Sequence, residues 1–221
     1  MRVVGADVWK RGWVTVEVTG GRVTGVVSFD SFADLITHHA GAVAIGVDIP
    51  IGLPTEPPRQ ADVLARRFVG PRASSVFNTP PRDVLEAPSY QEALHISRTR
   101  YGAGISAQSF ALRHRIFEVE AARQGDDRLI EVHPEVSFCA LAGGPLDYSK
   151  KTWNGQMLRR QLLATAGLRL PDTISGPADR VPVDDVLDAA AAAWSAARWA
   201  ADRAQALPER VDEPADQTIW Y

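Results

Sequence analysis

The sequence has 221 residues, 45% of them hydrophobic and 23% charged, which are the proportions of an ordinary globular protein with a substantial core. A net charge of −3 gives no overall basic signature for nucleic acid, and a single cysteine excludes an intramolecular disulfide and a zinc site built from several cysteines. Because no apolar run is long enough to cross a bilayer, we expect a cytoplasmic protein without a membrane segment.

The first 29 residues predict three antiparallel strands. Residues 2–8 are mostly apolar and are typical of a short buried strand. Residues 12–19 alternate valines with other side chains, which is the two-residue period of a strand with one covered face. The pair Gly20-Gly21 favours a tight hairpin into a further strand over residues 22–29.

A helix and a central strand are expected next. Ser31 is a typical N-cap for a helix that runs through His39. Residues 42–53 are apolar apart from Asp48, which predicts a strand covered on both faces and therefore parallel to its neighbours. Pro50 marks its end, since proline cannot donate a ladder hydrogen bond.

Residues 55–127 differ in character, because they are rich in arginine and proline. Helices are expected over 59–69 and 106–124, separated by a loop over 70–82 that is punctuated by proline and glycine. We interpret the whole region as an insertion or lid that packs on the sheet.

The remaining elements are a strand, three helices and a short terminal strand. The strand is expected within 128–135, and a short helix follows through Leu141. Longer helices are expected over 152–166 and 183–200, the second of them rich in alanine. The last residues, 218–221, favour a short strand that pairs back onto the sheet.

Carboxylates are placed where such a fold would gather them. Parallel strands form sites at their C-terminal ends, and each predicted central strand carries an acid near that end. The alanine-rich helix carries two more, three residues apart on one face, and its small side chains permit a close approach to the sheet. The candidate catalytic acids are therefore Asp7, Asp48, Glu131, Glu135, Asp185 and Asp188.

Such a cluster repels itself unless a cation neutralises it. Oxygen ligands suit Mg²⁺ or Mn²⁺, and we expect the metal ligands to be Asp7, Asp48, Asp185 and Asp188. Two such ions about 4 Å apart can activate a water and stabilise the leaving oxygen of a phosphodiester. The alternative for the helix acids is capping, and Asp184 is the residue we expect to be only a cap.

Polar and basic residues elsewhere are candidates for phosphate binding. The expected substrate-binding residues are Arg72, Ser74, Ser75, Arg82, Gln108, Lys150 and Lys151. The competing interpretation is a structured surface loop that is held by its own arginines. His133 is more typical of a hydrogen-bonded structural group than of a ligand. Trp9, Trp13, Trp194 and Trp199 favour core positions over base-stacking platforms.

The motifs resemble those of the ribonuclease H-like superfamily. The resemblance is closest to the domain-of-unknown-function family 429, bacterial and archaeal proteins predicted to be ribonuclease H-like nucleases, and it covers essentially the whole chain. The matching stretches are GAD (5–7), VDIPIGLP (47–54), GPRASSVFNTPPR (70–82), GISAQSF (104–110), EVHPEVSF (131–138), KKTWNG (150–155) and DDVLDAAAAAW (184–194).

The resemblance implies a single α/β domain over residues 1–221, with a ribonuclease H-like mixed five-stranded sheet and the helical insertion at 55–127. It implies that Asp7 bridges both metals and that Asp48 is the acid at the end of the fourth strand. Asp185 and Asp188 match the paired helix acids. Glu131 and Glu135 depart from the pattern, which requires no acid there.

These expectations give a function hypothesis with two alternatives. The leading one is a metal-dependent nuclease or phosphodiesterase with a two-metal mechanism, whose partner is a nucleic acid or nucleotide substrate. The first alternative is an ATP-dependent phosphotransferase of the actin and sugar-kinase type, but residues 8–13 lack its glycine- and threonine-rich phosphate turn. The second is a binding module that keeps the fold without catalysis.

Overall fold

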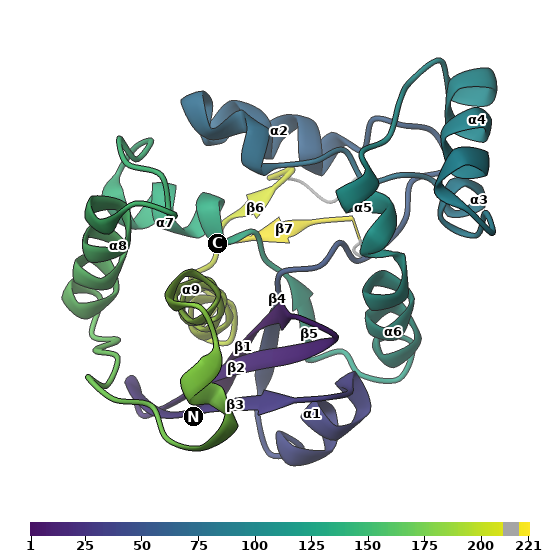
Figure 1. Ribbon diagram of the computed structural model, residues 1–221. Coiled ribbons are helices and arrows are strands. Elements are labelled where there is room, and N and C mark those ends of the chain that lie inside the picture. Colours follow the sequence, from purple (N-terminus) through teal and green to yellow (C-terminus); the bar gives the residue numbers. More distant parts are fainter. Residues whose placement is uncertain (210–216) are drawn as a thin grey trace.

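The computed structural model describes residues 1–209 and 217–221, and these form an α/β fold (Figure 1). Within them, one open mixed sheet has seven strands in the order β3-β2-β1-β4-β5-β7-β6. The strands are β1 Arg2–Trp9, β2 Gly12–Thr19, β3 Arg22–Phe29, β4 Ala44–Val47, β5 Leu129–Glu131, β6 Ala206–Leu207 and β7 Ile219–Trp220.

Helices precede, separate and follow the later strands. The α-helices are α1 Phe32–His38, α2 Gln60–Phe68, α3 Arg82–Leu85, α4 Tyr90–Tyr101, α5 Ala107–Ala111, α6 Arg113–Arg123, α7 Pro134–Ala142, α8 Trp153–Thr165 and α9 Val183–Trp199. Two 3₁₀ helices are η1 Gly70–Ser75 and η2 Gly176–Arg180. In the part of the chain that the structure describes, no helix is both long and apolar enough to cross a membrane.

The antiparallel part of the sheet confirms the two-residue period in the sequence. β1 pairs antiparallel with β2, and β2 pairs antiparallel with β3. β4 is parallel to β1, and β5 is parallel to β4. The sheet exceeds the five strands predicted, because β7 pairs with β5 and β6 then pairs with β7. The predicted terminal strand is therefore present, and β6 was missed.

Several predicted elements are shorter or interrupted. β4 is shorter than the strand expected over 42–53. Its last hydrogen bond to β1 is the one that Asp48 N donates to Ala6 O at 3.0 Å. The helix expected over 106–124 is broken at Leu112 into α5 and α6. Helix α4 was missed, although Ser89 caps its start and Gly102 ends it in the left-handed region.

Helices cover the two faces of the sheet as separate layers (Figure 1). α1 and α6 bury residues such as Leu35 and Ile116 against one face, together with Trp13. α7, α8 and α9 cover the other face with a larger core, against which Trp9, Trp194 and Trp199 are partly buried. The four tryptophans are thus packing residues, as predicted.

Helix α9 lies directly on β1 and β4. A Cβ atom at Gly5 would come within 2.0 Å of Ala189 O, and one at Gly46 within 2.6 Å of Ala192 O. Both distances are shorter than any real contact, so glycine on the strands and alanine on the helix are required together. The alanine run therefore places α9, and with it Asp188, against the centre of the sheet.

Candidate metal centre

Three carboxylates from three elements meet at the C-terminal ends of the central strands. Asp7 is near the end of β1, Asp48 directly follows β4, and Asp188 is on α9. One oxygen atom from each of the three lies within 4.8 Å of the others. The cluster could therefore hold a metal ion, as the parallel pairing of β1 with β4 and the close approach of α9 had led us to expect.

The acidic cluster is largely withdrawn from solvent. Asp7 is 8% exposed and Asp188 only 1%. Asp7 Oδ1 accepts a hydrogen bond from Val8 N at 2.7 Å. Among the described residues, no donor reaches the buried Oδ1 of Asp188. A buried carboxylate oxygen without a partner is costly, and a bound cation would offset that cost.

Burial and mutual repulsion make these acids weaker than usual. Burial, followed by the charges of Asp48 and Asp188, raises the pKa of Asp7 well above its ordinary value. Burial raises the pKa of Asp48 to about 6, with Lys150 opposing the rise. Burial likewise raises the pKa of Asp188 to about 6, again opposed by Lys150. Each shift signals a site that lacks positive charge.

Two lysines supply part of that charge. Lys150 forms an ion pair with Asp188, and Lys151 forms one with Asp184. Burial lowers the pKa of Lys150, but attraction to Asp188 and then to Asp48 outweighs it, so the pKa lies above its usual value. Both lysines were predicted to bind phosphate, and the structure places both beside the acids.

The first turn of α9 holds the other two aspartates. Asp185 is half-buried and lines the same cavity as Asp7, but it is not one of the three acids whose oxygens converge. Burial, with repulsion from Asp184, raises the pKa of Asp185 to about 6. The prediction that Asp184 caps the helix is wrong, because Pro182 is the N-cap and Asp184 is a buried ion-pair partner.

Glu131 is bound by an arginine that the sequence analysis missed. Arg59 donates from Nη2 to Glu131 Oε1 at 2.5 Å and from Nη1 to Oε2 at 2.7 Å. The same guanidinium binds Asp62, whose other oxygen accepts from Thr79 N at 2.6 Å. This buried network fixes the start of α2 against β5, and Glu131 is not one of the three converging acids.

Glu135 has a matching arrangement with Arg159 on α8. Arg159 Nη2 donates to both carboxylate oxygens at 2.8 Å, and Nη1 donates to Tyr148 O at 3.0 Å. Both side chains are almost fully buried. The pair ties α7 to α8 and to the segment before Lys150, so it positions the lysine rather than completing the acidic cluster.

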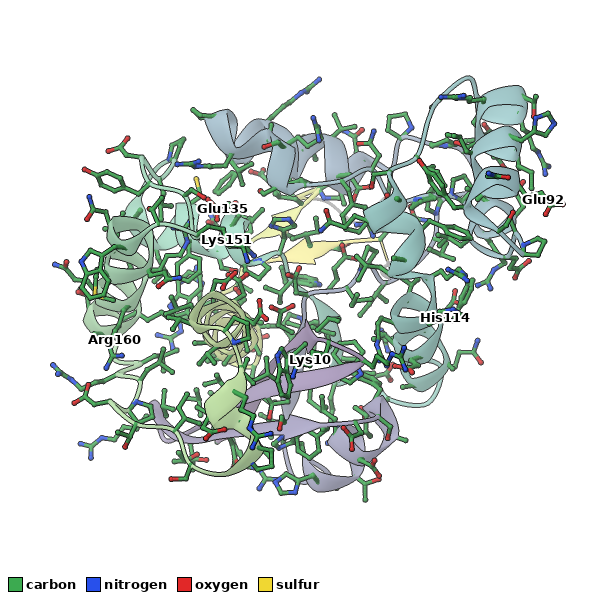
Figure 2. All side chains as sticks on the ribbon, viewed as in Figure 1. Lys10, Glu92, His114, Glu135, Lys151 and Arg160 are labelled. Atoms are coloured by element: carbon green, nitrogen blue, oxygen red, sulfur yellow. The ribbon has the colours of Figure 1, made fainter. Side chains whose placement is uncertain are left out.

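Two adjoining cavities, of about 350 and 240 Å³, open onto the cluster. Both are lined by Asp48, Ser75, His133, Lys150 and Lys151. Lys151 and Glu135, which line the smaller cavity, lie near α9 in Figure 2, whereas Glu92 lies on the remote α4. A phosphate-sized group there would thus meet carboxylates, ammonium groups and hydroxyl groups.

Most predicted substrate-binding residues line these cavities. The members are Arg72, Ser74, Ser75, Gln108, Lys150 and Lys151. Arg82 is the exception, because it is in α3 and pairs with Glu120 and Glu86. Arg72 also holds its own loop, since its Nη2 donates to Asp147 O at 2.6 Å.

His133 lines both cavities without a strong partner. Its Nε2 is 3.4 Å from Ser75 O, and burial lowers its pKa, so the imidazole is neutral near pH 7. Its Nδ1 is buried, with no hydrogen-bond partner among the described residues. This matches the prediction of a structural histidine only in part.

A comparison with protein families finds one matching model, described as Protein of unknown function (DUF429), over residues 5–213. The matched span contains all three converging aspartates and both lysines. No curated protein matches the chain, and no solved structure does.

Proposed function

The chain belongs to the DUF429 family, and from this premise we propose that it is a metal-dependent nuclease or phosphodiesterase. The observation that carries the proposal is the convergence of Asp7, Asp48 and Asp188 within 4.8 Å at the mouth of two cavities. Acids crowded in this way, with raised pKa values, are typical of a site that binds cations.

The sheet supports placing the chain among ribonuclease H-like folds. The order β3-β2-β1-β4-β5, with the first three strands antiparallel and the next two parallel, matches the arrangement that the resemblance implies. Asp7, Asp48 and Asp188 then occupy the first strand, the end of the fourth strand and the late helix. Strands β6 and β7 are additions to that core.

The residues present fit a hard divalent cation. The three converging groups offer only oxygen atoms, and the buried Oδ1 of Asp188 has no donor among the described residues. Oxygen ligands of this kind favour Mg²⁺ or Mn²⁺ over softer metals. When bound, two such ions would activate a water and stabilise the leaving oxygen of a phosphodiester.

The protein's own groups have separable roles in this proposal. Asp7, Asp48 and Asp188 would hold the metal, and Asp185, which lines the larger cavity with Asp7 and Asp48, would supply a further oxygen ligand. Lys150 is paired with Asp188 in the metal-free protein. Once Asp188 holds a cation, the Lys150 ammonium is available to a substrate phosphate.

Further phosphate contacts would come from other residues that line the two cavities. Arg72, Ser74 and Ser75 line the smaller cavity, and Gln108 lines the larger one. Their guanidinium, hydroxyl and amide groups are suited to phosphate oxygens. Arg82 points to Glu120 instead and has no part in this role.

The test is hydrolysis in Mn²⁺ of single-stranded, duplex and branched nucleic acids, and of the small diester bis(p-nitrophenyl) phosphate. We expect cleavage that EDTA abolishes and that Asp7→Asn and Asp48→Asn each lower by at least about 100-fold. The control is Asp127→Asn, which changes a fully exposed aspartate that lines neither of the two cavities.

The same proteins should be examined for binding as well as turnover. We expect Mn²⁺ to raise the melting temperature of wild type and Asp127→Asn, but not of Asp7→Asn. The proposal fails if Mn²⁺ neither stabilises the wild type nor supports cleavage of any of these substrates. Stabilisation by ATP alone would favour the phosphotransferase alternative instead.

A further inference from the structure

A second group of potential metal ligands lies away from the acidic cluster. It comprises Glu17, His38 and His39, each of which offers one ligand atom within 4.8 Å of the others. Glu17 is on β2, His38 is the last residue of α1, and His39 directly follows it. The proposed nuclease site uses none of the three.

The fold explains why these three residues meet. On β2, Trp13, Thr15 and Glu17 share one face by the two-residue period, and Trp13 packs with the α1 residues Phe32 and Leu35. The C-terminal end of α1 therefore brings its two histidines over Thr15 and Glu17. Phe29 of β3 contacts both imidazole rings, with centroid distances of 5.2 and 5.6 Å.

The hydrogen bonds of His39 determine which ring nitrogen is free. We assign the Thr15 Oγ1 proton to Val27 O at 3.3 Å, and in that arrangement the hydroxyl accepts a hydrogen bond from His39 Nε2 at 3.2 Å. The Nδ1 atom of His39 therefore carries a lone pair. His39 is fully buried, and no described residue donates to this nitrogen.

The lone pair on His39 Nδ1 is suited to binding a metal ion. Metal-binding histidines usually donate their other ring N–H to a neighbouring oxygen, which fixes the tautomer, and the Thr15 hydroxyl accepts that hydrogen bond here.

We propose that Glu17, His38 and His39 bind a divalent transition-metal ion of the Zn²⁺ class. Two imidazoles and one carboxylate are a donor set that suits Zn²⁺, with a fourth position left to water or another ligand. The all-oxygen acidic cluster favours Mg²⁺ or Mn²⁺ instead, so the two sites take different metals.

The two sites are separated by the sheet itself. Glu17 is opposite Val4 of β1, whereas Asp7 is opposite Val14 of β2, three residues further along β1. Residues 3 and 14 pack on the α9 side and residues 4 and 13 on the α1 side, so Asp7 and Glu17 are on different faces. Metal binding at Glu17 can thus be measured with the acidic cluster disabled.

Arg2 is the cation that now balances Glu17. Its Nη1 is 3.5 Å from Glu17 Oε1, and its side chain is 33% exposed. A metal ion would compete with this guanidinium for the carboxylate. Removal of the arginine charge is therefore expected to tighten metal binding rather than weaken it.

Calorimetric titration of ZnCl₂ into metal-stripped full-length protein tests the inference. The background is the Asp7→Asn, Asp48→Asn double variant, so that the acidic cluster makes no contribution. We expect one bound Zn²⁺ per chain and at least about 10-fold weaker binding after His38→Ala or Glu17→Gln. His95→Ala, which changes an exposed histidine on α4, is the matched control and should bind as the parent does.

Two further measurements distinguish a loss of metal binding from a loss of folding. His38 is exposed and Glu17 is partly exposed, so these variants should keep the far-UV circular dichroism of the parent. Arg2→Gln should bind Zn²⁺ more tightly than the parent. The inference is overturned if the parent binds no Zn²⁺, or if His38→Ala and Glu17→Gln bind it as tightly as the parent.

Discussion

At the scale of single residues, Lys150 is the cation that partly neutralises the acidic cluster. It pairs with Asp188, and its charge opposes the rise in the pKa of Asp48. Its side chain is 38% exposed, so one side of the ion pair is open to solvent. A displaceable ammonium of this kind links folding to metal binding, because either cation satisfies the same carboxylate.

Lys150→Met should therefore destabilise the metal-free protein and increase its response to metal. We expect a loss of about 1–2 kcal/mol in EDTA, below the ~3–5 kcal/mol for a fully buried pair, because solvent screens the half-exposed lysine. The stabilisation by Mn²⁺ should exceed that of wild type. Urea unfolding with and without Mn²⁺ measures both, with Lys151→Met as the control that spares Asp188.

The pH dependence should follow from the weakened acids. Asp48 and Asp188 have pKa values of about 6 in the folded protein against an ordinary value of 3.8, so folding favours their protonated forms. Their contribution to stability is fully present below about pH 3.8 and is lost as the pH rises through 6. As the pH is lowered from about 8 to about 5, the metal-free protein should therefore become more stable, because these two carboxylates take up protons in the folded state.

Protons and metal ions compete for the same oxygens, so stabilisation by Mn²⁺ should fall below about pH 6. Melting curves from about pH 5 to about pH 8, with and without Mn²⁺, measure both trends. Asp48→Asn removes one of the titrating carboxylates. Without metal, the melting temperature of this variant should therefore depend less on pH than that of wild type. A wild-type Mn²⁺ response that is unchanged across this range would contradict the assignment of these acids as ligands.

Sequence reasoning at this scale found the acids but not their partners. Asp7 and Asp48 stand out because an acid in an apolar strand needs a counter-charge. Nothing local indicates that Glu131 instead meets Arg59, which is 72 positions away, or that Glu135 meets Arg159 on α8. Such pairings depend on the packing of whole elements, which a single sequence does not specify.

At the scale of elements, the contact between α9 and β1 determines whether the cluster exists. The helix backbone touches the strand at Gly5, where there is no room for a side chain. Any shift of α9 away from β1 also carries Asp188 away from Asp7. Helix packing and metal binding are therefore expected to fail together.

Gly5→Ala tests this coupling. Its Cβ would be 2.0 Å from Ala189 O, and a backbone atom cannot move aside alone. We expect a loss of about 1–3 kcal/mol in stability, as for other overpacked core positions, and no stabilisation by Mn²⁺. In the control Gly25→Ala on β3, the new Cβ meets only Glu17 at 3.7 Å and should change neither property.

The sequence predicted this packing because the alanine run of α9 is unusual, and it has few other structural explanations. It predicted the first three strands equally well, since their two-residue period is local. The break at Leu112 between α5 and α6 was missed, because the sequence pattern there remains helical on both sides. Interruptions imposed by tertiary packing leave no periodic signal.

At the scale of the whole molecule, the sheet extends beyond the predicted five strands. β6 and β7 have two residues each, and they are too short to show any periodicity. β7 pairs with β5 through Glu131 and Ile219, and this brings the C-terminal residues beside the Arg59 network. The extra strands thus support the wall of the larger cavity, which Ile219 lines.

The seven-stranded sheet has helices on both faces (Figure 1). Two groups of potential metal ligands among the described residues lie on opposite faces of it. The acidic cluster was predicted from the sequence, because Asp7 and Asp48 lie at the ends of central strands and Asp188 lies on the alanine-rich helix that packs on them. The group of Glu17, His38 and His39 was not predicted, because its contacts depend on where α1 ends over β2. A site at strand ends can be predicted once the strand order is known. A site between a helix end and a strand can be recognised only when the three-dimensional structure is known.

The most direct test of the proposed metal centre is a crystal structure with Mn²⁺, with anomalous scattering measured at the manganese edge. The proposed function requires anomalous density bound by oxygens of Asp7, Asp48 and Asp188, with the Lys150 ammonium withdrawn from Asp188. Crystals in saturating Mn²⁺ that show no density there, and that keep the Lys150–Asp188 pair intact, would contradict it.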